Sequence, residues 1–412
     1  MAPSRASTKR RRISSGVAVD VNGRSPQDKH EVFTQWAKHR GVVIGSVKPA
    51  QIPGRGVGLI TTASIKQDEE LVFVPKAAMF TPLKSYAGGN LSHKASPHAQ
   101  LSLSIMTECE RPDSTYKVWK STWPSPQDLE SNMPLFWSRK LRALLPPSVQ
   151  QPLDRQFDDW NKDAEFRKNM AADIHDGSGT PDEDDVMKYY WAIVNSRSFH
   201  FKSPGAKPGF MVLCPFIDYM NHGPSGTGVN VRQSAKGYEV TANRDYVAGE
   251  EVLATYGAHP NDKLLVHYGF INSSEPGAPS DDDVRLDHYI LDNLSSTTRD
   301  QLQDVGYLGS YALLPATNEI CFKTQVAVRA ELLTANEWEY FISNGEDLSN
   351  DQSDKVKRWL EPFLDGYRSD AESKIAELKA MKPGKSEAGP VQLLLARWQQ
   401  IHDALDAFVR EG

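Results

Sequence analysis

Two short stretches in the second half of the chain combine polar, aromatic and glycine residues, and neither means much alone. The first spans 214–222 and ends in Asp-Tyr-Met-Asn-His, and the second spans 249–257 and ends in Thr-Tyr-Gly. Asn221 and His222 together offer donors and acceptors for a polar cofactor that carries an amine, a carboxylate and a heterocycle. A fold for this chain has to place these two stretches in a common structure.

The first stretch has two other interpretations. Cys214, Asp218 and His222 stand four residues apart, a spacing that would align them on a helix as zinc ligands. Pro215 interrupts a helix there, however, and no other Cys or His gathers nearby. A loop whose Asp, Asn and His side chains satisfy backbone groups is the simpler alternative and stays open on this stretch alone. We expect no bound metal.

A glycine-rich turn, Gly54-Arg-Gly-Val-Gly58, lies far upstream. A dinucleotide-binding fingerprint would follow a strand and open a helix, whereas these glycines precede a strand with the wrong spacing. The turn is then either a tight connection before a hairpin or a backbone surface against which a flat or charged ligand lies.

The last candidate motifs are two Tyr-Gly pairs, at 256–257 and 268–269. Tyr256 closes a predicted strand, and Tyr268 follows twelve residues later, after a short amphipathic helix. A single tyrosine at a strand end usually serves packing. Two of them around a glycine turn, after an Asn-His pair, favour a functional site.

The remaining pattern predicts two β-rich portions separated by helices. Strand-like runs occur at 59–65 and 70–75, which we interpret as a strand pair, and again at 210–213, 228–232 and 237–242, the last two as a hairpin around 234–237. Residues from about 97 to 188 form a helical insertion, and 274–283 have the composition of a linker. Helical patterns beyond the linker predict a C-terminal helical domain. In the chain as a whole, helices are predicted over 30–39, 154–170, 182–194, 324–341, 351–381 and 391–409.

Composition restricts the class of protein. The 412 residues suffice for two domains, 39% of them are hydrophobic, and no apolar run is long enough for a membrane span. Three widely spaced cysteines fit a reducing compartment, and a net charge of −6 argues against non-specific nucleic-acid binding. Residues 1–28 are predicted to be disordered, and their run Lys9-Arg-Arg-Arg12 is either a nuclear-import signal or a solvated basic tail.

Six motifs in one order resemble the SET-domain methyltransferases of the Rubisco large-subunit methyltransferase type, which include ribosomal-protein lysine methyltransferases. The motifs are Arg55-Gly-Val-Gly-Leu, Asn195-Ser-Arg197-Ser-Phe, Asp218-Tyr-Met-Asn-His222, Gly249-Glu-Glu, Thr255-Tyr256-Gly and Asn261 to Tyr268-Gly-Phe270. The resemblance covers roughly residues 30–410. It implies an α+β fold: a SET-domain β-core of short strands with a pseudoknot and a large helical insertion over 29–275, then an all-helical substrate-binding domain over 284–412.

The resemblance also implies a cofactor and roles for individual residues. The cofactor is S-adenosylmethionine, bound near Arg55, Gly56 and Val57, by Arg197, and by Asn221 and His222. Tyr256 matches the catalytic tyrosine of the family, and the positions that match the lysine channel are Asp218, Tyr238 and Tyr268. The chain departs from some relatives at Phe201, where they carry a second basic residue, and it lacks a cysteine-rich module after the core.

These residue types suit methyl transfer to an amine. The reaction needs a neutral amine, whereas a free lysine has a pKa of about 10.4. A narrow aromatic channel disfavours the ammonium form by desolvation, and tyrosine hydroxyls and carbonyls orient the lone pair.

The sequence therefore predicts a protein-lysine N-methyltransferase that acts on a non-histone protein, with a ribosomal protein as the family-based candidate. Methylation of a histidine is the first alternative, and the second Tyr-Gly pair weighs against it. A binding module that kept the fold and lost turnover is the second. We expect a monomer in the nucleus and cytoplasm whose partner is a protein bearing the target lysine, with no direct nucleic-acid or membrane partner.

Overall fold

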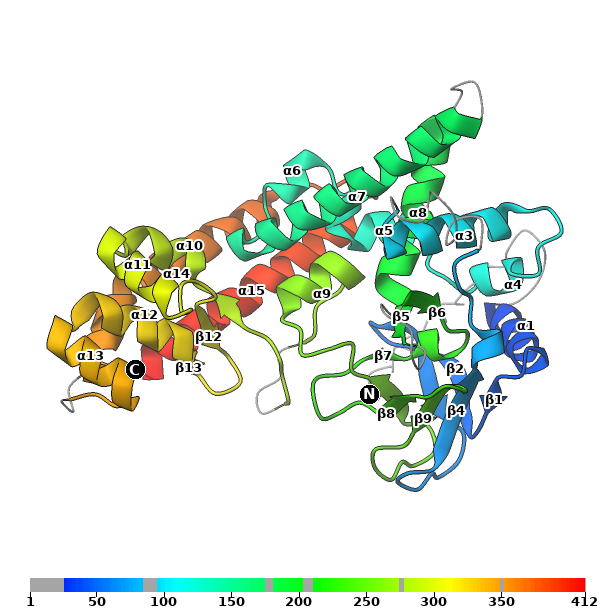
Figure 1. The fold of residues 1–412 in the computed structure, drawn as a ribbon, viewed down its shortest axis with the longest axis horizontal. Helices are drawn as coiled ribbons and strands as arrows, with labels where there is room; N and C mark the ends of the chain where they lie inside the picture. Colours follow the sequence, from blue (N-terminus) through cyan, green and yellow to red (C-terminus); the bar gives the residue numbers. More distant parts are fainter. Residues whose placement is uncertain are drawn as a thin grey trace, which may run out of the picture.

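The computed structural model describes residues 26–83, 95–174, 181–202, 210–273, 278–348 and 352–411. The chain forms a β-rich part, at the lower right of Figure 1, and a long helical part that extends from it to the left. Within the described ranges, no helix has the length and apolar character that crossing a membrane requires. The predicted import signal lies outside the described residues.

Two four-stranded sheets make up the β-rich part, which helix α1 (Pro26–His39) covers on one side. The first sheet has the order β1 (Val43–Ile44), β4 (Glu70–Pro75), β9 (Gly237–Thr241), β8 (Asn230–Gln233). The second has the order β2 (Val47–Ile52), β3 (Gly56–Thr61), β10 (Glu251–Ala254), β7 (Asn221–His222). Each sheet thus joins strands from before and after the helical insertion.

The predicted pairing of 59–65 with 70–75 is wrong. These runs contain β3 and β4, which lie in different sheets: β3 pairs with β2 and β10, and β4 pairs with β1 and β9. The polar connection between the runs passes from one sheet to the other, and Asp68 takes a positive φ of 66° in it. Sequence proximity suggested a hairpin, but each of the two strands pairs with one strand that precedes it and with one strand that follows the insertion.

The predicted hairpin around 234–237 is confirmed. β8 and β9 pair antiparallel, with Gln233 opposite Tyr238. Gly237 is required there, because a Cβ at this position would lie 2.1 Å from the carbonyl oxygen of Val74.

In the described residues between β4 and β5, six helices form the insertion. They are α3 (Pro97–Glu110), α4 (Lys117–Lys120), α5 (Pro126–Asn132), α6 (Arg139–Arg142), α7 (Pro147–Ile174) and α8 (Pro181–Arg197). Serine caps begin several of them: the Ser96 side chain accepts from the backbone N–H of Ala99, and Ser125 forms a capping box with Asp128. α8 leads directly into the hairpin of β5 (Ser198–Phe201) and β6 (Phe210–Leu213).

The C-terminal part is helical except for one small sheet, which corrects the expectation of an all-helical domain. Its helices are α9 (Asn261–Tyr268), α10 (Asp287–Ile290), α11 (Ser296–Asp304), α12 (Phe322–Leu332), α13 (Ala335–Asn344), α14 (Gln352–Ala380) and α15 (Ala388–Glu411). The sheet consists of β11 (Val284–Arg285), β12 (Ala312–Leu314) and β13 (Glu319–Ile320). The helix predicted over 324–341 is two helices, because Thr334 starts α13 with its own capping box to Glu337.

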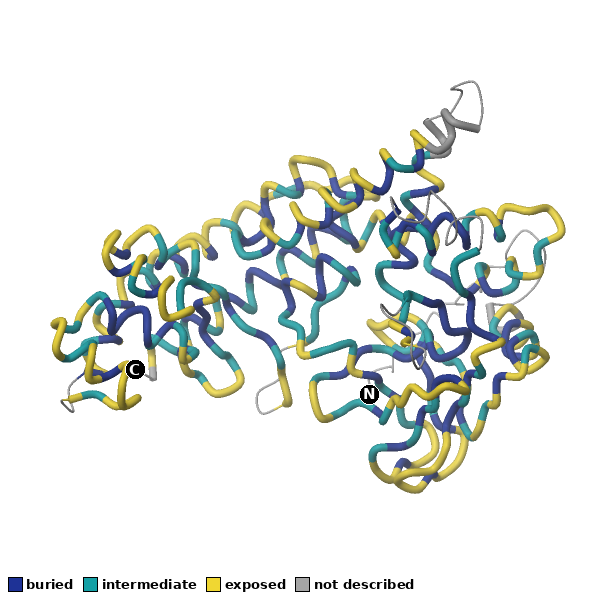
Figure 2. The backbone as a smooth tube through the Cα atoms, viewed as in Figure 1, coloured by how far each residue is buried: buried dark blue, intermediate teal, exposed yellow. Residues whose placement is uncertain are grey.

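Two large hydrophobic cores divide the molecule, and Figure 2 shows buried segments running through both parts. One core takes in residues of both four-stranded sheets and includes Trp119 of the insertion. The other fills the C-terminal part and also takes in residues of α7 and the α9 residues Leu265 and Val266. α9 therefore shares this second core and packs against α7 and α8 of the insertion, although it follows the β-core strands closely in sequence.

Candidate active site

The Asn-His pair and the Tyr-Gly turn lie side by side. β7 and β10 pair in parallel, with Leu253 opposite Asn221 and Ala254 opposite His222. The chain enters β7 through a buried turn in which Phe216 has φ 75° and ψ −44°, a conformation that core packing has to hold in place. This pairing delivers Tyr256 next to His222.

Tyr256 is fixed by two hydrogen bonds. Its backbone N–H donates to Nδ1 of His222 (3.1 Å), and its phenol donates to the carbonyl oxygen of Met220 (2.6 Å). Burial raises the pKa of Tyr256 to about 12, so the phenol is neutral near pH 7. Because its proton is given to a carbonyl, the phenol oxygen presents its remaining lone pairs to whatever lies opposite.

An aromatic cluster surrounds this phenol. The ring centroid of Tyr256 lies 4.9 Å from that of Tyr268 and 5.2 Å from that of His222, and Phe270 contacts all three rings. Gly269 ends α9 with φ 76°, which turns the chain between Tyr268 and Phe270. Four aromatic side chains from three segments thus form one wall.

The histidine in this wall is neutral. Burial lowers the pKa of His222 to about 4. Since Nδ1 accepts the Tyr256 N–H, the ring proton sits on Nε2, which is buried without a hydrogen-bond partner in the described part of the chain. The zinc interpretation therefore loses its histidine ligand at Nδ1, and no group of three candidate metal-binding side chains occurs among the described residues.

A group of polar side chains, Glu251 and Arg55, is joined to Asn221. Its amide donates to Glu251 (2.8 Å), and Glu251 also pairs with Arg55 (3.1 Å), whose guanidinium donates in addition to the carbonyl oxygen of His222. Gly58 leaves the room for this arrangement, because a Cβ there would lie 2.7 Å from the Asn221 nitrogen and 2.9 Å from a Glu251 oxygen. The glycine-rich turn thus brings β3 close to the Asn-His pair.

Arg197 lies at the end of α8 and reaches the same region. One guanidinium nitrogen donates to the carbonyl oxygen of Asp218 (2.8 Å) and stands 3.6 Å from its carboxylate. That carboxylate is 3% exposed and accepts from the indole of Trp119 (3.0 Å). Burial raises the pKa of Asp218, which Arg197 and the indole partly oppose.

The structure brings together most, but not all, of the residues that the motifs predict. Arg55, Asn221, His222, Tyr256 and Tyr268 are linked by the hydrogen bonds and ring contacts described above. Gly56 and Val57 begin β3 at the same turn. Asp218 lies two residues before Met220 on the short turn at 217–219, and Arg197 reaches that turn from the end of α8. The roles of these residues remain predictions.

Tyr238 is placed differently. Its phenol donates to the carbonyl oxygen of His200, and its ring contacts Phe199 and Phe201 of β5. In the described part of the chain no ring contact joins it to Tyr256. Its predicted place in the lysine channel would therefore have to be on the β5 side.

Three residues of the site escaped sequence reasoning. Glu251 lies in the Gly249-Glu-Glu motif and Phe270 in the Tyr-Gly-Phe motif, but neither motif indicated a role for the residue. Trp119, which holds Asp218 from 99 positions upstream, had none.

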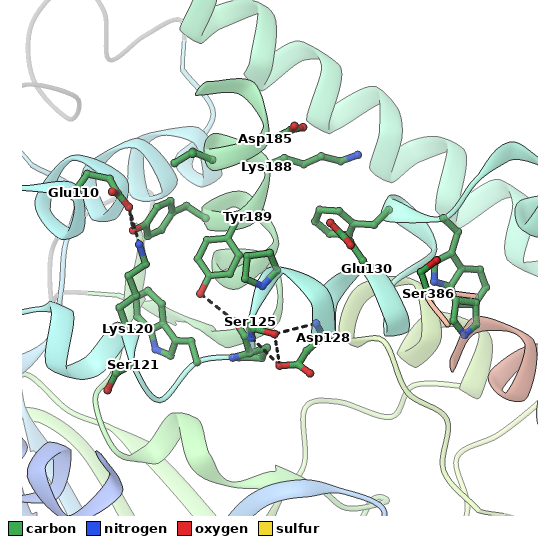
Figure 3. A pocket seen from close by; sticks show the side chains of 18 of the residues that line it. Glu110, Lys120, Ser121, Ser125, Asp128, Glu130, Asp185, Lys188, Tyr189 and Ser386 are labelled. Atoms are coloured by element: carbon green, nitrogen blue, oxygen red, sulfur yellow. Dashed lines mark hydrogen bonds and ion pairs between the residues drawn. The ribbon is translucent and has the colours of Figure 1, made fainter. Parts of the chain in front are cut away.

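A cavity of about 1110 Å³ lies away from these residues, between α5, α8 and the start of α15. Figure 3 shows its wall, where Tyr189 points toward the segment of Ser125 and Glu110 pairs with Lys120. None of the predicted site residues lines it. Its size alone does not make it the active site.

Comparison with known proteins identifies the core. The model of the SET domain matches residues 56–257, which span the glycine turn, the Asn-His pair and Tyr256. Residues 56–257 of the chain form a SET domain. The predicted family and the α+β fold are confirmed.

The chain is similar to several curated proteins. SET domain-containing protein 4 of Homo sapiens is 23% identical over 71% of this chain and 72% of its own length. Ribosomal lysine N-methyltransferase set11 of Schizosaccharomyces pombe is 29% identical over 44% of each chain. An actin-histidine N-methyltransferase of Canis lupus familiaris is 26% identical over 63% of this chain and 45% of its own. The matches thus span from under half to about seven tenths of these relatives.

The similarity in fold to solved structures extends beyond the SET domain. The structure of Rubisco LSMT bound to sinefungin and monomethyllysine aligns with 94% of this chain and 93% of its own, with a TM-score of 0.59 and 17% identity. The likeness therefore includes the insertion and the C-terminal part of this SET-domain protein.

Proposed function

We propose that this SET-domain protein is an S-adenosylmethionine-dependent protein-lysine N-methyltransferase that acts on a non-histone protein. The observation that carries the proposal is the position of Tyr256. Its phenol is tied to Met220, its backbone to His222, and its ring faces Tyr268 at 4.9 Å. A fixed, neutral phenol inside an aromatic wall is what orientation of a lysine amine requires.

The polar residues fit the cofactor. S-adenosylmethionine, when bound, supplies an activated methyl group on a sulfonium with a neutral leaving group. Its amine suits the carboxylate of Glu251 and the amide of Asn221, and its carboxylate suits the guanidinium of Arg197. The missing side chain at Gly58 keeps Asn221 and Glu251 within 2.8 Å of each other, which holds this donor and acceptor set together.

The aromatic wall prepares the lysine. Burial between Tyr256, Tyr268 and Phe270 disfavours the ammonium form, so the proton leaves for water before transfer. The Tyr256 oxygen and nearby backbone carbonyls then hold the amine in line with the methyl group. No covalent bond to the enzyme is needed.

A ribosomal protein is the first candidate substrate, because the relative from Schizosaccharomyces pombe is named a ribosomal lysine methyltransferase. That relative matches over 44% of each chain, so its substrate supports a choice of what to test first. Proteins of chromatin and signalling come next.

Labelled methyl transfer tests the function. Purified enzyme and S-adenosylmethionine with a labelled methyl group are added to a cell lysate, and the acceptor is identified by mass spectrometry. Tyr256→Phe removes the oriented hydroxyl, and we expect transfer to fall at least about a hundredfold. Tyr340→Phe, on an exposed helix, is the matched control and keeps full activity. Full activity in Tyr256→Phe contradicts the assignment.

The acceptor residue separates the alternatives. A methylated lysine in the acceptor peptide supports the proposal, and a methylated histidine replaces it with the histidine alternative, against which the presence of Tyr268 argues. Binding of S-adenosylhomocysteine with no transfer to any lysate protein indicates a binding module instead.

The proposed enzyme is a monomer of the nucleus and cytoplasm. Sedimentation tests the first point. Imaging of the full chain in cells tests the localisation. The comparison is a variant in which Lys9 and the following three arginines are changed to alanine.

A further inference from the structure

The two tyrosines of the aromatic wall lie on segments that pack into different cores. Tyr256 lies at the end of the SET match, whereas Tyr268 lies on α9, beyond the last matched residue, Gly257. The buried α9 residues Leu265 and Val266 belong to the C-terminal core. The spacing between the two rings therefore depends on how α9 is held, by α7 and α8 of the insertion near its end and by the C-terminal part at its first turn.

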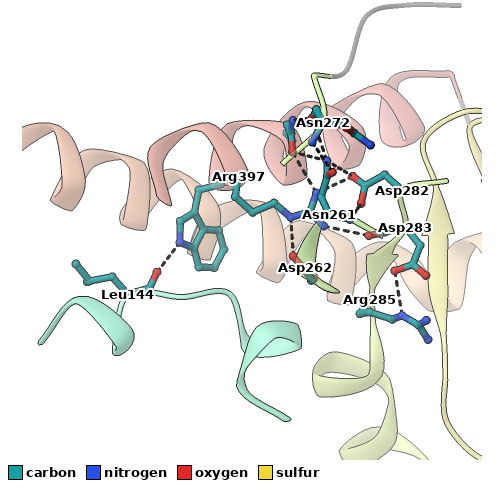
Figure 4. A network of polar contacts seen from close by, with 10 residues as sticks. Leu144, Asn261, Asp262, Asn272, Asp282, Asp283, Arg285 and Arg397 are labelled. Atoms are coloured by element: carbon teal, nitrogen blue, oxygen red, sulfur yellow. Dashed lines mark hydrogen bonds and ion pairs between the residues drawn. The ribbon is translucent and has the colours of Figure 1, made fainter. Parts of the chain in front are cut away.

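One arginine of α15 holds the first turn of α9. The side chain of Arg397 is fully buried, and its Nε donates to Asp262 (2.6 Å). Its Nη1 donates to Asp282 (2.6 Å), and its Nη2 donates to the carbonyl oxygen of Asp283 (3.1 Å). Figure 4 shows this guanidinium between α9 and the segment before β11.

Asn261 closes the α9 segment at both ends. Its side-chain Oδ1 accepts from the backbone N–H of Asn272 (2.8 Å), and its side-chain Nδ2 donates to the backbone carbonyl oxygen of Asn272 (3.2 Å). Its own backbone N–H donates to Asp282 (2.8 Å), and Gln400 of α15 bonds both Asn261 and Asn272. Tyr268 lies between these two fixed ends.

The acidic stretch before β11 takes part in the same network, which corrects its interpretation as a plain linker. Asp282 is 9% exposed and accepts from both Arg397 and Asn261. The preceding Asp281 accepts from the backbone N–H of Ser225, in the loop that follows the Asn-His pair. The stretch thus ties the SET domain to the C-terminal part.

We infer that Arg397 is a positioning residue for the aromatic channel: from α15 it fixes α9 and thereby sets the place of Tyr268 opposite Tyr256. The consequence for catalysis rests on the proposed function, whereas the anchoring of α9 does not. A planar guanidinium meets two carboxylates and a carbonyl at once. A lysine at this position keeps the charge but cannot make the three contacts together.

Arg397→Lys tests the inference, with Arg329→Lys as the matched control. Arg329 is also a buried arginine of the C-terminal part, and it pairs with Asp347, away from α9. Hydrogen exchange of the amides of 261–272 is measured first. We expect exchange about ten- to a hundredfold faster in Arg397→Lys than in the wild type, and no such change in Arg329→Lys. Asp262→Asn, which keeps an oxygen for Nε, shows the same direction if Arg397→Lys does not fold.

Affinity for S-adenosylhomocysteine and the rate of methyl transfer are measured next. S-adenosylhomocysteine affinity stays within about threefold of the wild type, because Arg55, Asn221 and Glu251 do not touch α9. The initial rate of labelled methyl transfer to the lysate acceptor falls about tenfold or more in Arg397→Lys, and the same substitution costs little in a Tyr268→Phe background.

The outcomes separate the two proposals. Unchanged exchange of 261–272 in both Arg397→Lys and Asp262→Asn overturns the inference, whatever the activity. An equal loss of transfer in the wild-type and Tyr268→Phe backgrounds also overturns it, because Arg397 would then not act through Tyr268. A wild type that transfers no methyl group refutes the proposed function, while faster exchange in Arg397→Lys would still establish the anchor.

Discussion

Gly58→Ala offers a direct test of the cofactor site, because the structure shows what one added carbon would meet. The new Cβ would lie 2.7 Å from the Asn221 amide nitrogen, 2.9 Å from a Glu251 oxygen and 3.0 Å from Cγ1 of Ile52. Ordinary contact begins at 3.4 Å, so the amide has to move by about 0.7 Å (3.4 − 2.7). The 2.8 Å hydrogen bond between Asn221 and Glu251 lies directly in the way.

The expected cost falls on binding more than on folding. All three atoms are in side chains that can give way, so the loss in the free energy of unfolding is about 1–2 kcal/mol. The displaced Asn221 amide and Glu251 carboxylate no longer meet the charged groups of the cofactor, and one such lost hydrogen bond costs about 1.5–3 kcal/mol of binding free energy, or affinity about ten- to a hundredfold weaker.

Isothermal titration with S-adenosylhomocysteine measures the affinity, and thermal denaturation measures the stability. Gly366→Ala is the control, because Gly366 lies inside α14 with open space around it. It gains about 0.5–1 kcal/mol of stability and leaves the affinity unchanged. If Gly58→Ala binds within about twofold of the wild type, Asn221 and Glu251 do not hold the cofactor and the reasoning fails.

Two further predictions concern stability. His98 stacks on Trp191 at 4.2 Å, and burial lowers its pKa to about 4. As the pH falls below 6.5, the unfolded chain takes up a proton on His98 before the folded chain does. The free energy of unfolding of the wild type, measured by urea denaturation, therefore falls by about 2 kcal/mol between pH 7 and pH 5, and His98→Phe lacks this loss. An equal dependence of stability on pH in the two proteins refutes this. Trp119→Phe leaves the buried carboxylate of Asp218 without its indole donor, and we expect a loss of about 2 kcal/mol or more in the free energy of unfolding, whereas a change below about 0.5 kcal/mol would show that the bond contributes nothing.

Local patterns in the sequence were enough to predict the elements and the motif residues. Periodicity placed α8, α14 and α15 to within a few residues, and the strand at 210–213 matches β6. The fold class and the family are confirmed by comparison. These features depend on neighbours in the chain, where hydrophobic period and turn residues act directly.

Pairing between strands was less predictable. The sequence suggested that 59–65 and 70–75 pair, but β3 and β4 join different sheets. The partners of a strand depend on which strands offer an apolar face in space, and one partner of each of these two strands comes from the far side of the insertion.

The sequence by itself determined which residues could do chemistry: an Asn-His pair, two tyrosines and a glycine turn. Only the tertiary structure decided how they are held. Met220 accepts from the Tyr256 phenol, Trp119 fixes Asp218, and Arg397 reaches α9 from 135 positions away. Each contact joins residues that no local pattern connects, because hydrogen bonding and burial act on distance in space and not along the chain.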